Sequence, residues 1–345
     1  MQFSTTFPAV TAFRYADGVA PNLAALSLVL IGWPVGIALL TAELWALNAI
    51  GLALLTLALV WSGYFIHEFA HQAIFRKPEV NDRWGTVMSW VNGSCYARFA
   101  GMRRKHMRHH IERADVMTFD ARGFLLNAPM PLRRAVLALE WAYVPAVELL
   151  MRGFVIALPF QAGGTGLNRL RTASIALLRV GAFATLGLYS PKALALYALA
   201  YVLFISVLRF ADCFQHTYDA YPVQGDAPIP QDKLRDRAYE QANTYSDVAG
   251  MESRWLNLLW LNFGFHNAHH ERPTVPWHRL PAYHRTLFAD GCTQLITVGE
   301  LLQSFHRHRV TRVLANDYGV VHSHAVPHRA DGFVGAVGVS FLTAV

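Results

Sequence analysis

Charged residues, and lysine in particular, are scarce in this chain. Of its 345 residues 15% are charged and 54% are hydrophobic, and four of the thirty basic residues are lysine. An average soluble domain has about 25% charged residues, so this composition, with its positive mean hydropathy, excludes an ordinary soluble domain. It predicts a polytopic membrane protein. The excess of arginine over lysine is typical of GC-rich bacterial genomes and favours a bacterial inner membrane.

Cysteine is also scarce. The three cysteines, Cys95, Cys213 and Cys292, lie far apart in the chain and form no CxxC pair. They indicate neither a disulfide framework nor a zinc ribbon or iron–sulfur cluster. Any metal site in this chain is therefore expected to use nitrogen and oxygen ligands.

Four apolar segments are long enough to cross a bilayer, which takes about 20 residues. They cover about residues 23–40, 44–66, 173–189 and 193–210. Short turns join the first to the second and the third to the fourth, so we expect two transmembrane hairpins. Residues 132–160 are also apolar but carry five charged side chains, including Glu148 and Arg152 at the spacing of a helical ion pair. We expect a helix there that lies against the membrane surface or a cytosolic cap.

The connection between the two hairpins is rich in arginine, whereas the hairpin turns hold only Glu43 and Lys192. By the positive-inside rule, this connection and both termini face the cytoplasm. We expect one domain over residues 1–345, with a cytosolic cap at about 67–172 and 211–310 and a tail at 311–345. The net charge of +7 then reflects topology and attraction to anionic lipids, and no nucleic acid is expected as a partner.

Histidine is abundant, and nine of the sixteen histidines fall into four clusters on the predicted cytoplasmic side. His67 and His71 follow the second span, and His216 follows the fourth. Two further clusters share the spacing HxxHH: they are His106, His109, His110 and His266, His269, His270. Imidazoles three or four residues apart lie on one face of a helix, so each cluster can direct its rings to one point. Their number predicts a polynuclear metal centre.

The number and type of these side chains indicate the metal chemistry. A catalytic zinc ion takes three protein ligands and a structural zinc four, so nine imidazoles exceed one zinc site. Imidazole without thiolate suits iron, copper, zinc or nickel, and two metal ions sharing about nine ligands fit the count. Residues 67–71 also match the HExxH pattern of zinc proteases, with Glu68 as general base. Because that interpretation leaves seven histidines unexplained, a membrane zinc metalloprotease is the weaker alternative.

The histidine boxes and the apolar spans together resemble the integral-membrane fatty acid desaturase and hydroxylase family. The resemblance rests on HxxxH after the second span, HxxHH in the following connection and another HxxHH after the second hairpin. It implies an all-α membrane protein with four transmembrane helices in two hairpins and a cytosolic helical cap. The cap would hold a histidine-rich, non-haem di-iron site that directs O2 against an unactivated C–H bond.

The resemblance also implies which residues bind the two irons. They are the nine clustered histidines: His67, His71, His106, His109, His110, His216, His266, His269 and His270. In the stearoyl-CoA branch of the family, an asparagine four residues before the isolated histidine holds a water on one iron, and Asp212 has that position here. We expect Asp212 either to bind iron or, as the preferred role, to accept a hydrogen bond that orients His216.

The expected activity is that of an O2-dependent desaturase that introduces a double bond into a fatty acyl chain, carried by an acyl lipid, acyl-CoA or acyl-carrier substrate. A hydroxylase or other monooxygenase on the same centre, acting on a lipid, carotenoid or specialised metabolite, is the alternative, because both reactions can share the first hydrogen abstraction. The chain has neither the haem motif of a fused cytochrome b5 nor a ferredoxin cysteine set, so electrons are expected from a separate ferredoxin or cytochrome.

The remaining histidines are expected to have other roles. His278 and His284 follow the third box and are interpreted as packing groups or as supports beneath it. A solvated, basic tail is expected around the others, which are His306, His308, His322, His324 and His328. Residues 332–345 are apolar but too short to span a bilayer.

Overall fold

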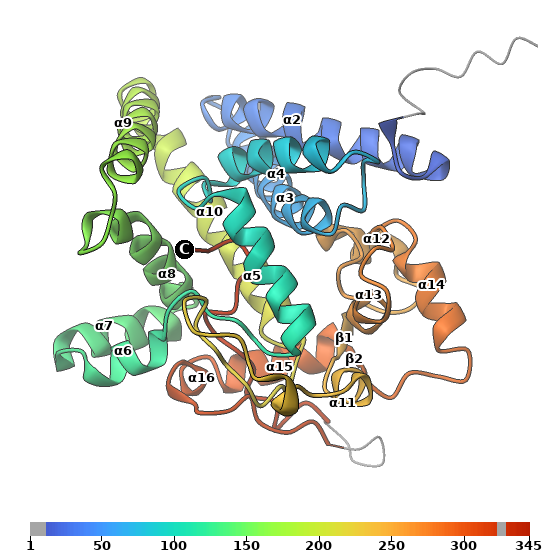
Figure 1. Ribbon diagram of the computed structural model, residues 1–345. Helices are drawn as coiled ribbons and strands as arrows, with labels where there is room; N and C mark the ends of the chain where they lie inside the picture. Colours follow the sequence, from blue (N-terminus) through green and yellow to red (C-terminus); the bar gives the residue numbers. More distant parts are fainter. Residues whose placement is uncertain (1–11, 323–328) are drawn as a thin grey trace, which may run out of the picture.

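The computed structural model describes residues 12–322 and 329–345, and these residues are mostly helical (Figure 1). Two short strands, β1 (Ser246–Val248) and β2 (Leu295–Thr297), pair in parallel with Asp247 opposite Ile296. The prediction of a mainly helical protein is confirmed.

Within residues 12–322 and 329–345, four helices are long and apolar enough to cross a membrane, which agrees with the number of predicted spans. They are α2 (Val19–Leu40), α3 (Trp45–Ala70), α9 (Gly166–Tyr189) and α10 (Pro191–Asp212). The helix α3 continues past the predicted end of its span, so the first histidine box begins inside it. The arrangement as two hairpins and the cytosolic cap stay predictions.

Close packing joins α2 to α3. A Cβ atom added at Gly36 would lie 2.9 Å from Leu55 Cβ, and one added at Gly51 would lie 2.9 Å from the carbonyl oxygen of Gly36. Small residues at such crossings let two helix backbones approach each other inside a membrane. The Asn48 amide donates to the carbonyl oxygens of Leu39, Leu40 and Ala42, and so satisfies the C-terminal end of α2.

The remaining helices are shorter, and α5 and α13 among them carry histidines of the second and third boxes. The α-helices among them are α4 (Pro78–Asn92), α5 (Phe99–Glu112), α6 (Ala121–Asn127), α7 (Met130–Trp141), α8 (Ala146–Ala157), α11 (Arg237–Ala242), α12 (Arg254–Asn257), α13 (His266–Glu271), α14 (Leu280–Leu287), α15 (Val298–Arg307) and α16 (Thr311–Leu314). Four 3-10 turns complete the described helices: η1 (Ala16–Gly18), η2 (Leu158–Phe160), η3 (Gln231–Lys233) and η4 (Leu258–Trp260).

The single helix expected over residues 132–160 is wrong in detail. The segment forms α7 and α8, because Tyr143 has a positive φ of 62° and Pro145 follows it. The expected ion pair within this segment is also absent from the described residues: Glu148 pairs with Arg209 of α10 instead of with Arg152. Glu140 of α7 accepts from the same guanidinium at 3.3 Å, so one buried cation ties α7 and α8 to α10.

The tail is not a solvated appendage where the structure describes it. Phe333, Phe341 and Leu342 are buried, and the last residues run inward to end between α8 and α5 (Figure 1). The Lys105 ammonium group donates to the carbonyl oxygens of Ser340 and Thr343, which fixes this segment to α5. The reason is hydrophobic burial: the segment is apolar and finds its cover in the protein interior. Two tail histidines, His324 and His328, lie outside the described residues.

We predict that Arg209→Met destabilises the protein by about 3–5 kcal/mol, because it leaves the Glu140 and Glu148 carboxylates buried without their cation. Thermal or denaturant unfolding of the purified protein in detergent measures this change. Arg235→Met is the control, because its pair with Asp219 is exposed and is expected to contribute less than about 1 kcal/mol. Equal effects of the two substitutions would contradict the structural role of Arg209.

Candidate metal centre

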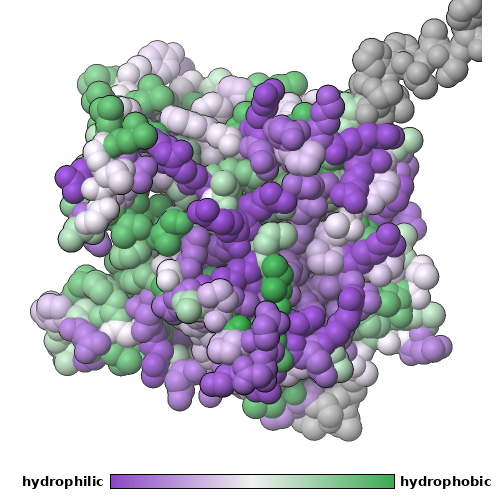
Figure 2. Space-filling view, viewed as in Figure 1, coloured by the Kyte–Doolittle hydropathy of each residue, from purple (hydrophilic) through white to green (hydrophobic). Residues whose placement is uncertain are grey.

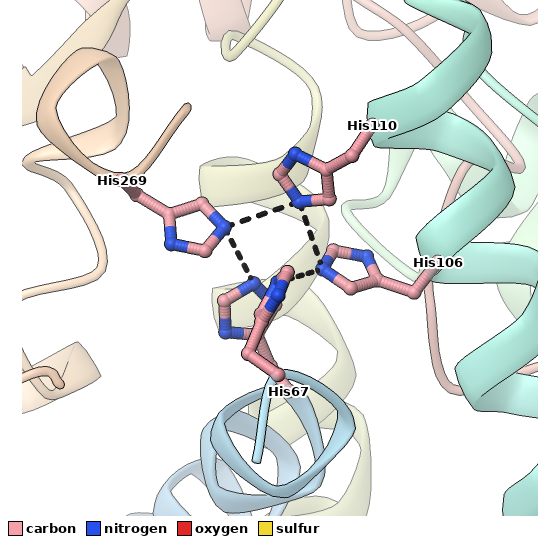
Figure 3. A group of neighbouring side chains, drawn as sticks. His67, His106, His110 and His269 are labelled. Atoms are coloured by element: carbon pink, nitrogen blue, oxygen red, sulfur yellow. Dashed lines mark hydrogen bonds between the residues drawn. The ribbon is translucent and has the colours of Figure 1, made fainter. Parts of the chain in front are cut away.

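Nine imidazoles from four segments meet in the interior and form two sets. The first set comes from the end of α3, from α5 and from α13, and four of its members are seen in Figure 3. It consists of His67, His71, His106, His110 and His269, whose nearest ring nitrogens lie within 4.8 Å of one another. The structure therefore brings five of the predicted metal ligands to one point.

The second set adjoins the first and comes from α5, α13 and the residues after α10. It consists of His109, His216, His266 and His270. The Nε2 atom of His216 lies 3.1 Å from those of both His266 and His270. The rings of His110 and His270 stand 4.4 Å apart, centroid to centroid, where the two sets meet.

Each HxxHH box divides between the two sets. On α5 the pair His106 and His110 faces the first set, and His109 faces the second. On α13 the roles are reversed: His266 and His270 face the second set, and His269 the first. Residues four apart share a helix face more closely than residues three apart, so this spacing lets one short helix serve two neighbouring sites.

Carboxylates behind the rings determine which nitrogens face the centre. The Nδ1 atom of His109 donates to the carbonyl oxygen of Ala114 at 2.8 Å, with one oxygen of Asp115 3.3 Å away, and the same Asp115 oxygen lies 3.2 Å from His216 Nδ1. The Glu240 carboxylate lies 2.8 Å from His270 Nδ1 and accepts from Arg113 Nε at 3.0 Å. A neutral imidazole with its proton on Nδ1 has a free lone pair on Nε2. These contacts therefore direct the Nε2 lone pairs of the three rings toward the middle of the second set.

Such a set of donors fits a bound cation. Facing Nε2 lone pairs about 3 Å apart cannot all hydrogen-bond to one another, because a neutral imidazole has only one N–H group. A metal ion accepts several imidazole lone pairs at once, and sites without thiolate suit iron, copper, zinc or nickel. The two sets, with five and four imidazoles, therefore have the chemistry of two metal sites.

Burial keeps these imidazoles ready to bind metal. It lowers the pKa of His71, His106, His110, His266 and His270, and neighbouring imidazoles lower it further. The pKa of His269 falls to about 3 for the same reasons. Burial by itself would raise the pKa of Asp115, but His216 and His109 hold it well below its usual range. These six rings are thus neutral and Asp115 is charged at pH 7.

Asp212 does not have the preferred role that the sequence suggested. The hydrogen-bond acceptor beside His216 is Asp115, and neither carboxylate oxygen of Asp212 has a hydrogen-bond partner among the described residues. Asp212 is buried at the end of α10 and lines a small cavity with Lys105 and His216. The sequence did not single out Asp115 or Glu240: Glu240 contacts a histidine 30 residues away, and Asp115 follows the second box but also contacts His216 of another segment.

Glu68 lies behind the first set rather than facing it. One carboxylate oxygen is 3.6 Å from His67 Nδ1, and the other accepts the backbone N–H of Trp277 at 3.0 Å. The His67 Nε2 atom points the opposite way, toward His269 at 3.1 Å. A general base in a zinc protease has to reach the metal-bound water, and Glu68 is turned away from that position.

His278 and His284 are outside both sets. His278 lies 3.6 Å from Asp17, and His284 is buried with its ring 5.3 Å from that of Phe265. Burial lowers the pKa of His284 to about 4, so it packs as a neutral ring. Packing fits both rings: His284 lies against Phe265, and the half-buried His278 lies beside Trp277 and Asp17.

Aromatic side chains cover the centre. The rings of Phe263 and Phe341 lie 4.5 and 5.7 Å from that of His67, and Phe341 comes from the tail. The cavity left beside the histidines has a volume of only about 40 Å³. This space suits a water molecule or a diatomic gas and is too small for an alkyl chain.

The profile of the fatty acid desaturase family matches residues 43–296, a stretch that contains all nine histidines. The chain belongs to the fatty acid desaturase family. No individual curated protein matches the sequence. Membership confirms the resemblance seen in the boxes, and it supports a membrane oxidoreductase with a histidine-rich, iron-type site. The family match leaves out α2 and the tail, so Phe341 is a feature of this chain beyond the matched region.

We predict that Asp115→Asn and Glu240→Gln each weaken metal binding by about 10- to 100-fold, because an amide no longer holds the imidazole tautomer that turns Nε2 inward. Competition with a chelator measures the affinity. Asp219→Asn, at an exposed carboxylate paired with Arg235, is the control. Unchanged affinity in the first two variants would show that these carboxylates do not position the desaturase histidines.

Acid is predicted to destabilise the metal-free protein. The pKa of His269 is about 3 in the folded state and about 6.5 when unfolded, so between these values the unfolded chain binds the extra proton. The free energy of unfolding therefore falls as pH drops below about 6.5, by about 1.4 kcal/mol per pH unit for each such histidine. Unfolding curves between pH 7.5 and 5 measure the slope, and His269→Gln should make it shallower. A pH-independent stability would refute the expectation.

Proposed function

We propose that this member of the desaturase family is an O2-dependent membrane fatty acyl desaturase that holds two irons. The observation that carries the proposal is the division of nine imidazoles, seven of them buried and two half-buried, into adjoining sets of five and four. Bound iron would supply the activation of O2 and the removal of hydrogen from adjacent methylene groups. The alternative of hydroxylation or another monooxygenation uses the same residues and differs only in the product.

The side chains have three tasks in this proposal. The nine histidines would hold the metals through neutral imidazole nitrogens, which add no negative charge to the site. Asp115 provides a compensating negative charge and, with Glu240, keeps the rings in place. Phe263 and Phe341 keep bulk water away from the reacting position. The orphaned carboxylate of Asp212 borders the small cavity and is available to a water or metal-bound group there.

A zinc protease finds no support in this geometry. It needs Glu68 on the metal side of His67, where the structure has His269. It also uses three protein ligands, whereas two complete sets of imidazoles are present. The desaturase proposal accounts for all nine histidines at once.

The site is proposed to face the cytoplasm of a bacterial inner membrane. Arginines of the segment between α3 and α9 support this orientation, since Arg104, Arg122 and Arg134 are exposed on it. Other arginines of this segment bind groups within the protein. Arg108, for example, binds Glu112 and the carbonyl oxygens of Val223 and Ala227. Electrons are proposed to come from a separate ferredoxin or cytochrome, which would dock on this cytoplasmic side.

Lipid analysis of a bacterial host that expresses the protein tests the proposal. We expect new acyl chains that have lost two hydrogens, and His266→Ala should abolish them. The control is His306→Ala, because His306 lies outside both sets. Acyl chains that gain an oxygen atom would indicate the alternative hydroxylase activity. An unchanged acyl profile in cells that contain the metal-loaded protein would contradict a fatty acyl substrate.

A further inference from the structure

A second and larger cavity lies on the apolar side of the molecule. Its volume is about 420 Å³, and it is bounded by α8, α9, α10 and the loop before α5. Figure 2 shows hydrophobic residues gathered over α8 and around α9, next to this region. Most of the lining is apolar, with Val155, Phe183 and Leu194 as examples. Two arginines, Arg152 and Arg179, are the exception.

Arg152 has no carboxylate partner among the described residues. Its guanidinium group lies over the rings of Tyr201 and Phe204, 5.6 and 5.7 Å from their centroids. Its Nη1 atom is buried and has no hydrogen-bond acceptor within the described chain. Glu148, one turn earlier on α8, is bound to Arg209. One face of the Arg152 guanidinium is therefore stabilised by aromatic rings, while its N–H groups remain available.

Arg179 of α9 lies in the middle of a predicted membrane span and, like Arg152, has no carboxylate partner among the described residues. It donates to the carbonyl oxygen of Trp90 and interacts with the Cys95 thiol, and neither is a carboxylate. Its Nε atom is buried and lacks an acceptor in the part of the chain that the structure describes. The Tyr201 hydroxyl is its neighbour: a Cβ added at Gly93 would lie 3.2 Å from that oxygen and 3.4 Å from Arg179 Nη1. Both guanidinium groups thus adjoin Tyr201.

Two cations without an anion are costly in such a place. Ionised side chains inside a membrane protein are rare, and they pair with an opposite charge or mark a ligand path. The unpaired N–H groups of Arg152 and Arg179 point to a ligand that supplies the missing charge. Guanidinium groups bind carboxylates through two parallel hydrogen bonds, which gives a directional site.

We propose that this cavity binds a single-chain fatty acid, with its carboxylate held by Arg152 and Arg179 and its alkyl chain along the apolar lining. The volume lies within the range of small-ligand sites, about 300–1,000 Å³, and suits one alkyl chain rather than the two chains of a phospholipid. The site narrows the range of substrates for the proposed desaturase to a chain with an anionic head group.

The position of the cavity connects it with the metal centre. Leu342 and Thr343 of the tail form part of its wall, and the preceding residue, Phe341, packs 5.7 Å from the His67 ring and 6.1 Å from the His106 ring. The tail therefore contributes both to the cavity wall and to the cover of the metal centre. Use of the bound fatty acid as substrate rests on the proposed function, whereas its binding does not.

Binding of radiolabelled palmitate to the purified protein in uncharged detergent tests the site without any turnover. We expect Arg152→Gln and Arg179→Gln each to weaken palmitate binding by about 10- to 100-fold, since each removes a charge-assisted hydrogen bond. Methyl palmitate, which has the same chain without the charge, should bind the wild type and the variants equally. Arg169→Gln is the matched control, because this arginine of α9 lies outside the cavity and contacts the Pro159 carbonyl.

Arg179→Lys separates binding from folding, because it keeps the positive charge and should retain more palmitate affinity than Arg179→Gln. Equal binding of palmitate and methyl palmitate by the wild type, or unchanged palmitate binding in both glutamine variants, would overturn the proposal. Arginine-dependent retention of phosphatidylglycerol with no effect on palmitate would also overturn it, in favour of a structural phospholipid. Arginine-dependent palmitate binding in a protein that leaves cellular acyl chains unchanged would support the site and contradict the desaturase function.

Discussion

The centre of this protein depends on the hydrogen bonds that hold imidazole rings from behind. The carbonyl oxygen of Ala114 accepts from His109 Nδ1, Asp115 contacts His216 Nδ1 and Glu240 contacts His270 Nδ1, so the corresponding Nε2 lone pairs face one another in the second set. Such an arrangement is unfavourable without a cation between the lone pairs. The rest of the fold keeps these groups dry and close together, because burial both lowers the pKa of the rings and strengthens the attraction of their lone pairs for a metal.

The helices explain how four distant segments reach one point. The apolar helix α3 continues beyond its predicted span and carries His67 in its last turn, with His71 directly after its end. The helices α5 and α13 then contribute one HxxHH box each, and every box serves both sets. A single buried cation, Arg209, ties α7 and α8 to α10, whose end precedes His216. The tail closes the remaining side with Phe341.

Much of the fold and of the metal centre could be predicted from the sequence, because the patterns that indicate them are local. Helical spacing within each box, the four apolar runs and the absence of cysteine pairs led to the family, which the profile match confirms. The same spacing predicted that the boxes meet, but which histidine belongs to which set depends on how α5 and α13 are turned. Glu240 carried no local signal because its partner His270 lies 30 residues away, and Asp115, although it follows the second box, also contacts His216 of another segment. Asp212 was expected beside His216 Nδ1 from its position in the sequence, but Asp115 makes that contact.

Local sequence patterns did not predict the burial of the tail or the partner of Glu148. Residues 332–345 are apolar yet too short for a span, and only the packed interior reveals that they line the space between two cavities. Likewise, Glu148 and Arg152 have ideal helical spacing, but a competing partner on α10 is closer. The central claim is that the two histidine sets hold two irons. Elemental analysis of the purified protein tests it most directly: the account predicts two irons per chain, and a fully active protein that carries a single zinc and no iron would contradict it.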